Sequence, residues 1–311
     1  MSETVLAPFT AADGENLALY EWPLGDWYGA MGPHAAPPRG VVLIVHGLGE
    51  HAGRYQRLVD TLLGWGFAVR AYDQRGHGES SGARGALPAE QTLIDDLAEM
   101  VDDTRARIKR LPSAPGRQQP LPLILFGHSL GGLVASRFVS LADASPAGVA
   151  PGRPVDALVL SSPALLTRLS VVQRMLLAFT PLLVPNLQVS NGLDARYLSH
   201  DPAVIQAYNS DPQVHAKISP RLGQFIAEAG PATLALAPRW HTPTLLLYAG
   251  DDHLVNPEGS RQFAAAAAAS ADVQPGLVTA QCFDGLYHEL FNELHAEPVF
   301  DALKAWLDAR F

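Results

Sequence analysis

Short apolar runs rich in β-branched residues alternate along this chain with longer amphipathic stretches, and this alternation limits the possible folds. The runs are expected to be buried strands, at 41–46, 67–72, 123–126, 157–162, 244–249 and 276–283. The stretches between them are expected to be helices, around 55–65, 89–110, 130–142, 257–270 and 293–310. This order predicts an α/β fold with a doubly wound, mostly parallel sheet. The segment 17–22 alternates more regularly, which indicates an antiparallel edge strand.

One long interval breaks the alternation. From Pro163 to about His241 the sequence shows only amphipathic and proline-punctuated segments, with no clear strand. The interval is too long for a plain crossover between two strands. We therefore expect residues 163–240 to form a helical cap inserted after the sixth strand, and residues 1–162 and 241–311 to form the core. Ligands of open α/β sheets bind beyond the carboxyl ends of the strands, so the cap would cover that site.

Composition and charge narrow the classes of function. Of 311 residues, 48% are hydrophobic and 17% are charged, which is enough apolar material for a large core. The formal net charge is −9, and the densest basic stretch, at 105–110, ends a predicted helix. Nucleic acid is therefore not an expected partner.

The expected compartment and membrane behaviour also follow from the residues. The single cysteine, Cys282, excludes an intramolecular disulfide framework and suits a reducing compartment. The first ten residues lack the basic start and apolar block of a signal peptide, so a cytoplasmic protein is expected. The most apolar window, 165–189, contains Arg168, Arg174 and two prolines, which argues against a membrane span of about 20 apolar residues. It would still suit contact with a lipid surface.

A glycine-rich turn carries the first candidate catalytic residue. The sequence GHSLGG at 127–132 follows the apolar run 123–126 and precedes a predicted helix, so Ser129 lies on a sharp strand-to-helix turn. The pattern also occurs by chance, and a Gly-rich turn of a nucleotide-binding fold is the alternative interpretation. A serine hydroxyl is a weak nucleophile, so catalysis requires a base and an acid that orients the base.

Both partners are expected later in the chain, the acid first and the base second. Asp251 and Asp252 directly follow the run 244–249, and either one would serve as the acid while the other caps the loop. His288 lies in the loop after the last predicted strand, where the base is expected, and His295 is the alternative.

A tetrahedral intermediate carries an oxyanion that needs preorganised backbone donors. The amide of Leu130, directly after the serine, would supply one, and the Gly-rich turn after the first core strand points to the amide of Leu48 as the other. The same turn contains His46, Glu50 and His51. His-x4-His on such a turn lacks the helical spacing that makes two imidazoles converge on an ion, so no metal is expected.

Five segments share the pattern of one family. They are HGLGEHAGRY at 46–55, YDQRGHGESSG at 72–82, GHSLGG at 127–132, YAGDDHLV at 248–255 and YHEL at 287–290. Together they resemble the monoacylglycerol lipase group of α/β-hydrolases, which also includes bacterial lysophospholipase-like esterases. The resemblance extends to the cap segment 197–219, and the matches run in order from about residue 40 to 290.

The resemblance implies an α/β-hydrolase fold and a triad of Ser129, Asp252 and His288. Asp252 is preferred over Asp251 because the family's acid precedes x-x-Val, as in DHLV. The family uses neither a cofactor nor a metal, and its oxyanion donors correspond to the two amides named above. Family members often have methionine after the nucleophile, and the leucine found here leaves the backbone donor unchanged.

The substrate side of the site also follows from the resemblance. Glu50 and Arg54 match positions near the glycerol end of the family's pocket, with a local surface ion pair as the alternative interpretation. Apolar cap residues, among them Leu176 and Phe179, would line a channel for an acyl chain, although most of them would pack the cap onto the core. The cap would also suit transient contact with a membrane surface. The sequence leaves the oligomeric state open.

The expected reaction is hydrolysis of a monoacylglycerol-like lipid ester through an acyl-enzyme. Lysophospholipase and general carboxylesterase activities are alternatives. A proline-type serine aminopeptidase is less favoured because its amine pocket should carry clustered acidic cap residues, whereas those of this cap are dispersed. A non-catalytic binding protein is also less favoured, because such proteins commonly lack a triad member.

Overall fold

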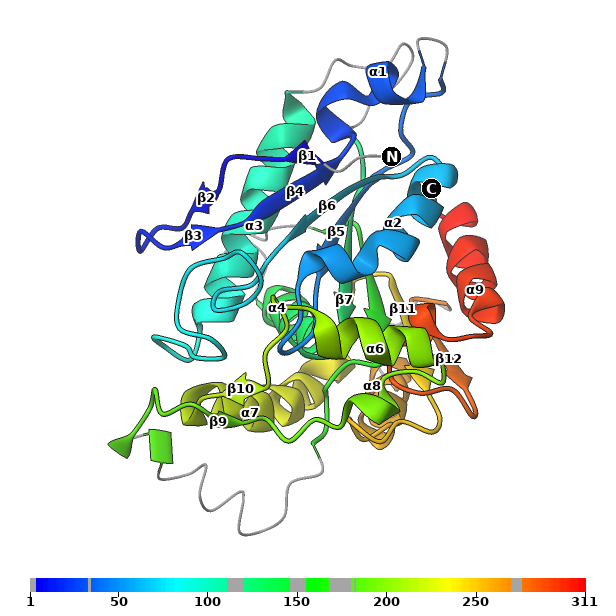
Figure 1. Ribbon diagram of the computed structural model, residues 1–311. Helices are drawn as coiled ribbons and strands as arrows, with labels where there is room; N and C mark the ends of the chain where they lie inside the picture. The colour runs from blue at the N-terminus through cyan, green and yellow to red at the C-terminus, as the bar shows by residue number, and fades with distance from the viewer. Residues whose placement is uncertain are drawn as a thin grey trace.

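The computed structural model describes residues 4–32, 35–110, 120–145, 155–167, 180–181, 183–269 and 276–311. An eight-stranded sheet forms the centre of this part of the chain (Figure 1). Its strands, in spatial order, are β1 (Thr4–Val5), β4 (Leu19–Trp22), β6 (Ala68–Tyr72), β5 (Val41–Val45), β7 (Leu123–His128), β8 (Ala157–Ser161), β11 (Thr244–Ala249) and β12 (Val278–Phe283). The strands from β6 to β12 run parallel, and β4 is antiparallel to both of its neighbours.

Helices cover both faces of the sheet. On one side α3 (Thr92–Lys109), α4 (Leu130–Ala144), α7 (Pro220–Leu236) and α8 (Glu258–Ala268) pack successively against one another. On the other side lie α2 (Gln56–Gly64) and α9 (Glu297–Asp308) (Figure 1). Because helices cover both faces, every residue of β5, β6, β7, β8 and β11 is buried, which explains their continuous apolar sequences.

The remaining described elements are short. They are the helices α1 (Trp27–Met31) and α6 (Pro202–Ser210), the strand pairs β2 (Phe9–Thr10) with β3 (Asn16–Leu17) and β9 (Val189–Ser190) with β10 (Lys217–Ile218), and 3₁₀ turns at Leu24–Asp26, Ala52–Tyr55, Ala195–Tyr197, Ala237–Arg239 and Leu290–Asn292.

Two predicted strands have a different environment from the one expected. The run 276–283 was expected to be buried, but β12 pairs only with β11 at the edge of the sheet, and its residues 279–281 are exposed. The segment 17–22 was expected to be an edge strand. It forms the antiparallel β4 but is not outermost, because β1 pairs along its other side.

The long interval after β8, the sixth strand of the sheet in chain order, is the one expected to form the cap. Its elements α6, β9, β10 and α7 lie at the carboxyl ends of the parallel strands (Figure 1). The expectation that this interval contains no strand is wrong, because β9 and β10 pair as an antiparallel ladder that is only two residues long and therefore has no visible periodicity. Of these elements, the helix α7 also packs against α4, so it belongs to the helix layer of the sheet as well.

The register of the sheet brings several turns to one edge. Val45 at the end of β5 lies opposite both Tyr72 and Gly127, and His128 at the end of β7 lies opposite Ser161. The turns that follow β5, β6, β7 and β8 therefore meet at the edge that the cap covers. Among the described helices, none combines the length and the apolarity needed to cross a lipid bilayer.

Candidate active site

Ser129 occupies the sharp turn between β7 and α4, as predicted from GHSLGG. Its backbone has φ 52° and ψ −117°, in the left-handed half of conformational space that non-glycine residues rarely adopt. Three backbone hydrogen bonds hold this conformation. The Ser129 amide donates to Ser161 O, and Ser129 O accepts the amides of Leu133 and Ala164, each at 3.0 Å. The start of α4 also lies so close to the end of β5 that a Cβ at Gly131 would be 2.1 Å from Val45 O.

Asp252 and His288 form a buried pair on two different loops. Asp252 Oδ1 accepts the amides of Leu254 and Val255 at 2.9 Å each, which leaves Oδ2 to meet His288 Nδ1 at 2.7 Å. The two side chains are 1% and 4% exposed. Because a carboxylate only accepts, Nδ1 carries the hydrogen and Nε2 is the ring nitrogen left for a second partner.

The environment of this pair shifts both pKa values. Burial alone would lower the pKa of His288, but the negative charge of Asp252 and the hydrogen bond to it raise the pKa above its usual value. Burial alone would raise the pKa of Asp252. The charge of His288, the hydrogen bond to it and the hydrogen bonds from two backbone amides outweigh burial and lower that pKa. The neighbouring His128 ring lies 4.7 Å from that of His288, and burial lowers the pKa of His128 to about 4.

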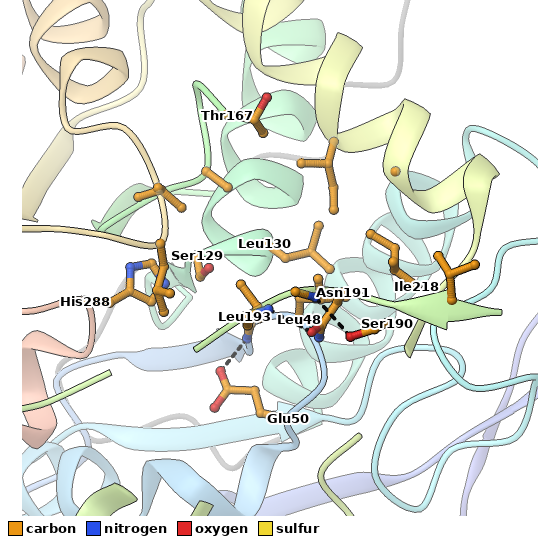
Figure 2. A pocket seen from close by; sticks show the side chains of 18 of the residues that line it. Leu48, Glu50, Ser129, Leu130, Thr167, Ser190, Asn191, Leu193, Ile218 and His288 are labelled. Carbon is orange, nitrogen blue, oxygen red and sulfur yellow. Dashed lines mark hydrogen bonds between the residues drawn. The ribbon is translucent and has the colours of Figure 1, made fainter. Parts of the chain in front are cut away.

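The two residues held as alternatives lie elsewhere. Asp251 is 55% exposed and pairs with His253 at the surface, 3.1 Å away. His295 is exposed beyond the last 3₁₀ turn. Ser129 and His288 both face one pocket (Figure 2), whereas neither alternative lines it.

The two backbone amides predicted as oxyanion donors belong to residues that line the same pocket as Ser129. Leu130 is the first residue of α4, so its amide has no acceptor within the helix. Leu48 lies in the turn after β5, and among the described residues its amide has no hydrogen-bond acceptor. Both residues line the pocket beside Ser129 (Figure 2).

The turn that contains Leu48 is held from within the core. His46 Nδ1 donates to Gly47 O at 2.8 Å, and His46 Nε2 accepts the amide of Gln74 at 2.8 Å. Both ring nitrogens are therefore used by the backbone, and burial lowers the pKa of His46, which keeps the ring neutral. The Gly47 amide donates to Glu50 Oε1 at 2.6 Å.

Glu50 and Arg54 form a buried ion pair rather than a surface one. Arg54 Nη1 donates to Glu50 Oε2 at 2.5 Å, and the two side chains are 5% and 10% exposed. The guanidinium also makes a two-pronged contact with Glu289, at 2.7 and 2.9 Å. Burial would raise the pKa of Glu50, but the charge of Arg54 outweighs it and lowers the pKa to about 2. All three side chains line the pocket.

The pocket itself is a largely apolar cavity of about 530 Å³. Its walls come from the turns of the core and from the cap, including Leu193, Leu198 and Ile226. Leu176 and Phe179, which the sequence suggested for an acyl channel, lie outside the described residues.

Three pocket residues were not singled out from the sequence. Glu289 directly follows His288 in the quoted YHEL motif, and Tyr208 stacks on the Arg54 guanidinium at 4.8 Å. Asn191 accepts the Leu193 amide through Oδ1 at 3.1 Å, while its buried Nδ2 has no partner among the described residues. Position in a motif would have pointed to Glu289, but nothing local in the sequence marks Tyr208 or Asn191.

Comparison with known proteins places the chain in a family. The family model described as serine aminopeptidase, S33, matches residues 36–295. The chain belongs to this family. As a member of the S33 family it is a hydrolase with the α/β-hydrolase fold, which confirms the fold that the sequence predicted and the resemblance that its motifs indicated.

Proteins similar to this chain differ in length. A monoacylglycerol lipase of Mycolicibacterium smegmatis is 34% identical over 274 residues, which cover 87% of this chain and 88% of that protein. The crystal structure of Paleococcus ferrophilus monoacylglycerol lipase is 32% identical with a TM-score of 0.73, covering 88% of this chain and 96% of that one. An abhydrolase domain-containing protein of Dictyostelium discoideum is 30% identical over 300 residues, and this chain spans only 28% of its length.

Proposed function

We propose that this hydrolase cleaves monoacylglycerol-like lipid esters, releasing a fatty acid and glycerol through an acyl-enzyme. The observation that carries the proposal is the buried Asp252–His288 pair beside a strained Ser129 at a largely apolar pocket. Relatives named monoacylglycerol lipase, at 34% and 32% identity and matched over most of their length, support the substrate class.

In the proposed mechanism Ser129 is the nucleophile, His288 the base and Asp252 the orienting acid. His288 Nε2 takes the hydroxyl proton as Oγ attacks the ester carbonyl, and the amides of Leu48 and Leu130 donate to the oxyanion. His288 then gives its proton to the departing alcohol. The same nitrogen later activates the water that releases the fatty acid from Ser129.

The head group and the acyl chain would occupy different parts of the pocket. Glu50, Arg54 and Glu289 form its charged wall, where an alcohol with several hydroxyls finds hydrogen-bond partners. The free Nδ2 of Asn191 adds a donor on the cap side. The apolar walls would take the acyl chain, at about 0.8 kcal/mol for each buried methylene.

The cap, proposed as residues 163–240, would also bring the enzyme to its substrate. Among its described residues, four large apolar side chains are exposed, namely Leu183 at 80%, Leu187 at 54%, Val189 at 47% and Val184 at 41%. All but Leu183 also line the pocket. We propose that this patch makes transient contact with a membrane surface, where such lipids collect, and that the protein is otherwise cytoplasmic.

The substrate class is tested by the dependence of kcat/KM on acyl length. Across glycerol monoesters from acetyl to dodecanoyl, kcat/KM should rise about fourfold per methylene until the apolar pocket is filled. Ser129→Ala should abolish turnover, and Ser210→Ala, which alters an exposed cap hydroxyl, should not. A flat profile would contradict the lipid substrate while leaving an esterase in place.

The S33 family name raises the aminopeptidase alternative, and one assay separates the two. Prolyl-naphthylamide and a monoacylglycerol are compared under the same conditions. A pocket for a free amine would present unpaired carboxylates, whereas Glu50 and Glu289 both bind Arg54. We expect turnover of the monoacylglycerol only, and faster turnover of the amide would contradict the proposal.

A further inference from the structure

The turn that contains Leu48 is held by the cap as well as by the core. The amide of His215, in the segment just before β10, donates to Gly49 O at 2.8 Å. His51 Nδ1 accepts the Gly53 amide, so its Nε2 carries the hydrogen that bonds Asp211 Oδ2 at 2.8 Å. The two contacts are made at Gly49 and His51, one and three residues after Leu48, on the same turn as the Leu48 amide.

The cap backbone lies directly against this turn. Gly49 has φ +76°, and a Cβ on it would lie 2.3 Å from His215 O, so only glycine fits. Asn191, directly after β9, donates its backbone amide to Ala216 O at 2.9 Å, and its Nδ2 would lie 3.5 Å from the same Cβ. Asn191 and Leu48 are seen together at the wall of the pocket in Figure 2.

The same cap segment is anchored on a second core turn. His215 Nδ1 accepts the Lys217 amide, so Nε2 donates to Gly76 O at 3.1 Å, and the imidazole packs 4.8 Å from the ring of His77. The Ser219 amide donates to Gly85 O at 2.8 Å. The segment 211–219 is thus fixed at both ends, which lets it transmit the position of the cap to the Leu48 turn.

We propose that Asp211 and His215 are positioning residues for the oxyanion hole: the seated cap holds the Leu48 amide in place through His51 and Gly49. This rests on the proposed role of Leu48 as an oxyanion donor. Donors stabilise a transition state only when they are preorganised, and a donor on a turn free to move loses part of that advantage. The cap then completes the donor set in addition to enclosing the acyl chain.

The proposal predicts a separation of kcat from KM. With a short, soluble ester such as p-nitrophenyl butyrate, Asp211→Ala should lower kcat about tenfold, less than the 10²–10³ lost when a donor is removed outright. KM should stay within about twofold, because the contact acts on the transition state. Affinity for an alkyl trifluoromethyl ketone, which forms an oxyanion on the enzyme, should fall in parallel with kcat/KM.

Conservative and control variants separate this role from a general loss of folding. Asp211→Asn and His51→Gln keep an acceptor and a donor, so both should retain most of the kcat. The double variant His51→Ala with Asp211→Ala should be no slower than His51→Ala alone, because Asp211 acts on the turn through its contact with His51. Glu228→Ala removes an exposed carboxylate of α7 that bonds only within its helix, and it should leave kcat unchanged.

Two results would overturn the proposal. One is a kcat for Asp211→Ala equal to that of Glu228→Ala. The other is a raised KM with unchanged kcat, which would limit the cap to binding substrate. Failure of the proposed function itself would look different, because Ser129→Ala would then keep its activity whatever Asp211→Ala does.

Discussion

The charge on His288 depends on nearby buried carboxylates, of which Asp252 has the largest effect. Burial lowers its pKa, but Asp252 outweighs burial and raises it, so kcat/KM should fall as the pH drops through a value above 6.5. Asp252→Asn should move this acid limb to lower pH and lower kcat by about 10⁴. Asp251→Asn alters an exposed neighbour and should leave the pH profile unchanged. An acid limb that does not move in Asp252→Asn would contradict the assignment.

Arg54 compensates two buried carboxylates at once. Arg54→Leu would leave Glu50 and Glu289 facing each other, which should cost about 3–5 kcal/mol of stability. In the intact protein the pKa of Glu50 is lowered to about 2, so its contribution is present above pH 4.5 and is lost as the pH falls toward 2. Without the guanidinium, burial would raise that pKa, and acid would relieve the penalty.

Thermal unfolding at pH 7 and pH 5 tests this account of Arg54. The difference in Tm between the intact protein and Arg54→Leu should be smaller at pH 5. Arg261→Leu removes a guanidinium that is 48% exposed, and it should change Tm little at either pH. A pH-independent difference would mean that packing, rather than charge, is lost.

The place of a residue in the fold was predictable where it directly follows a strand. Contacts between side chains that are far apart in the sequence were not predictable. The order of Ser129, Asp252 and His288 follows from the strands that precede them, because each lies in a turn after an apolar run. The contact between Arg54 and Glu289 spans 235 positions and has no local signature. The same holds for Asn191, which comes near the Leu48 turn only through the pairing of β9 with β10.

At the scale of elements, the unit of β7, the serine turn and α4 depends on close backbone approach. In Gly131→Ala the new Cβ would lie 2.1 Å from Val45 O and 2.4 Å from His46 O, so α4 would have to move away from β5. We expect a loss of several kcal/mol and of activity. In Gly64→Ala the Cβ would meet no atom within 4 Å, and stability should be unchanged or slightly raised. Equal Tm values for the two variants would contradict this account.

Element boundaries were predictable where burial is continuous and not where strands are at an edge. The ends of β5 and β11 follow the apolar runs because helices cover both faces of the sheet there. β12 was also expected to be buried, yet its middle residues are exposed, and it lies at the edge of the sheet with β11 as its one partner strand. Which strands lie next to one another decides whether a strand is central or at the edge, and the local sequence pattern does not show it.

At the scale of the whole molecule, the turns of the sheet position the proposed catalytic groups, and the proposed cap covers the pocket that contains them. The turns after the parallel strands bring Ser129, His288 and the Leu48 amide to one pocket, and the cap closes that pocket with apolar side chains. The sequence predicted the cap from the absence of a clear strand over a long interval. It did not predict how the cap contacts the core, because the backbone hydrogen bonds at Gly49 and Gly85 join residues far apart in the sequence and have no local signature.

The central claim is that Ser129 is a nucleophile activated by His288 and Asp252. A fluorophosphonate probe tests it most directly, because the probe forms a covalent bond only with an activated serine. The account predicts stoichiometric labelling of the intact protein, with the adduct located on Ser129 by mass spectrometry, and no labelling of Ser129→Ala. An intact protein that stays unlabelled, or a Ser129→Ala variant that labels equally well, would contradict it.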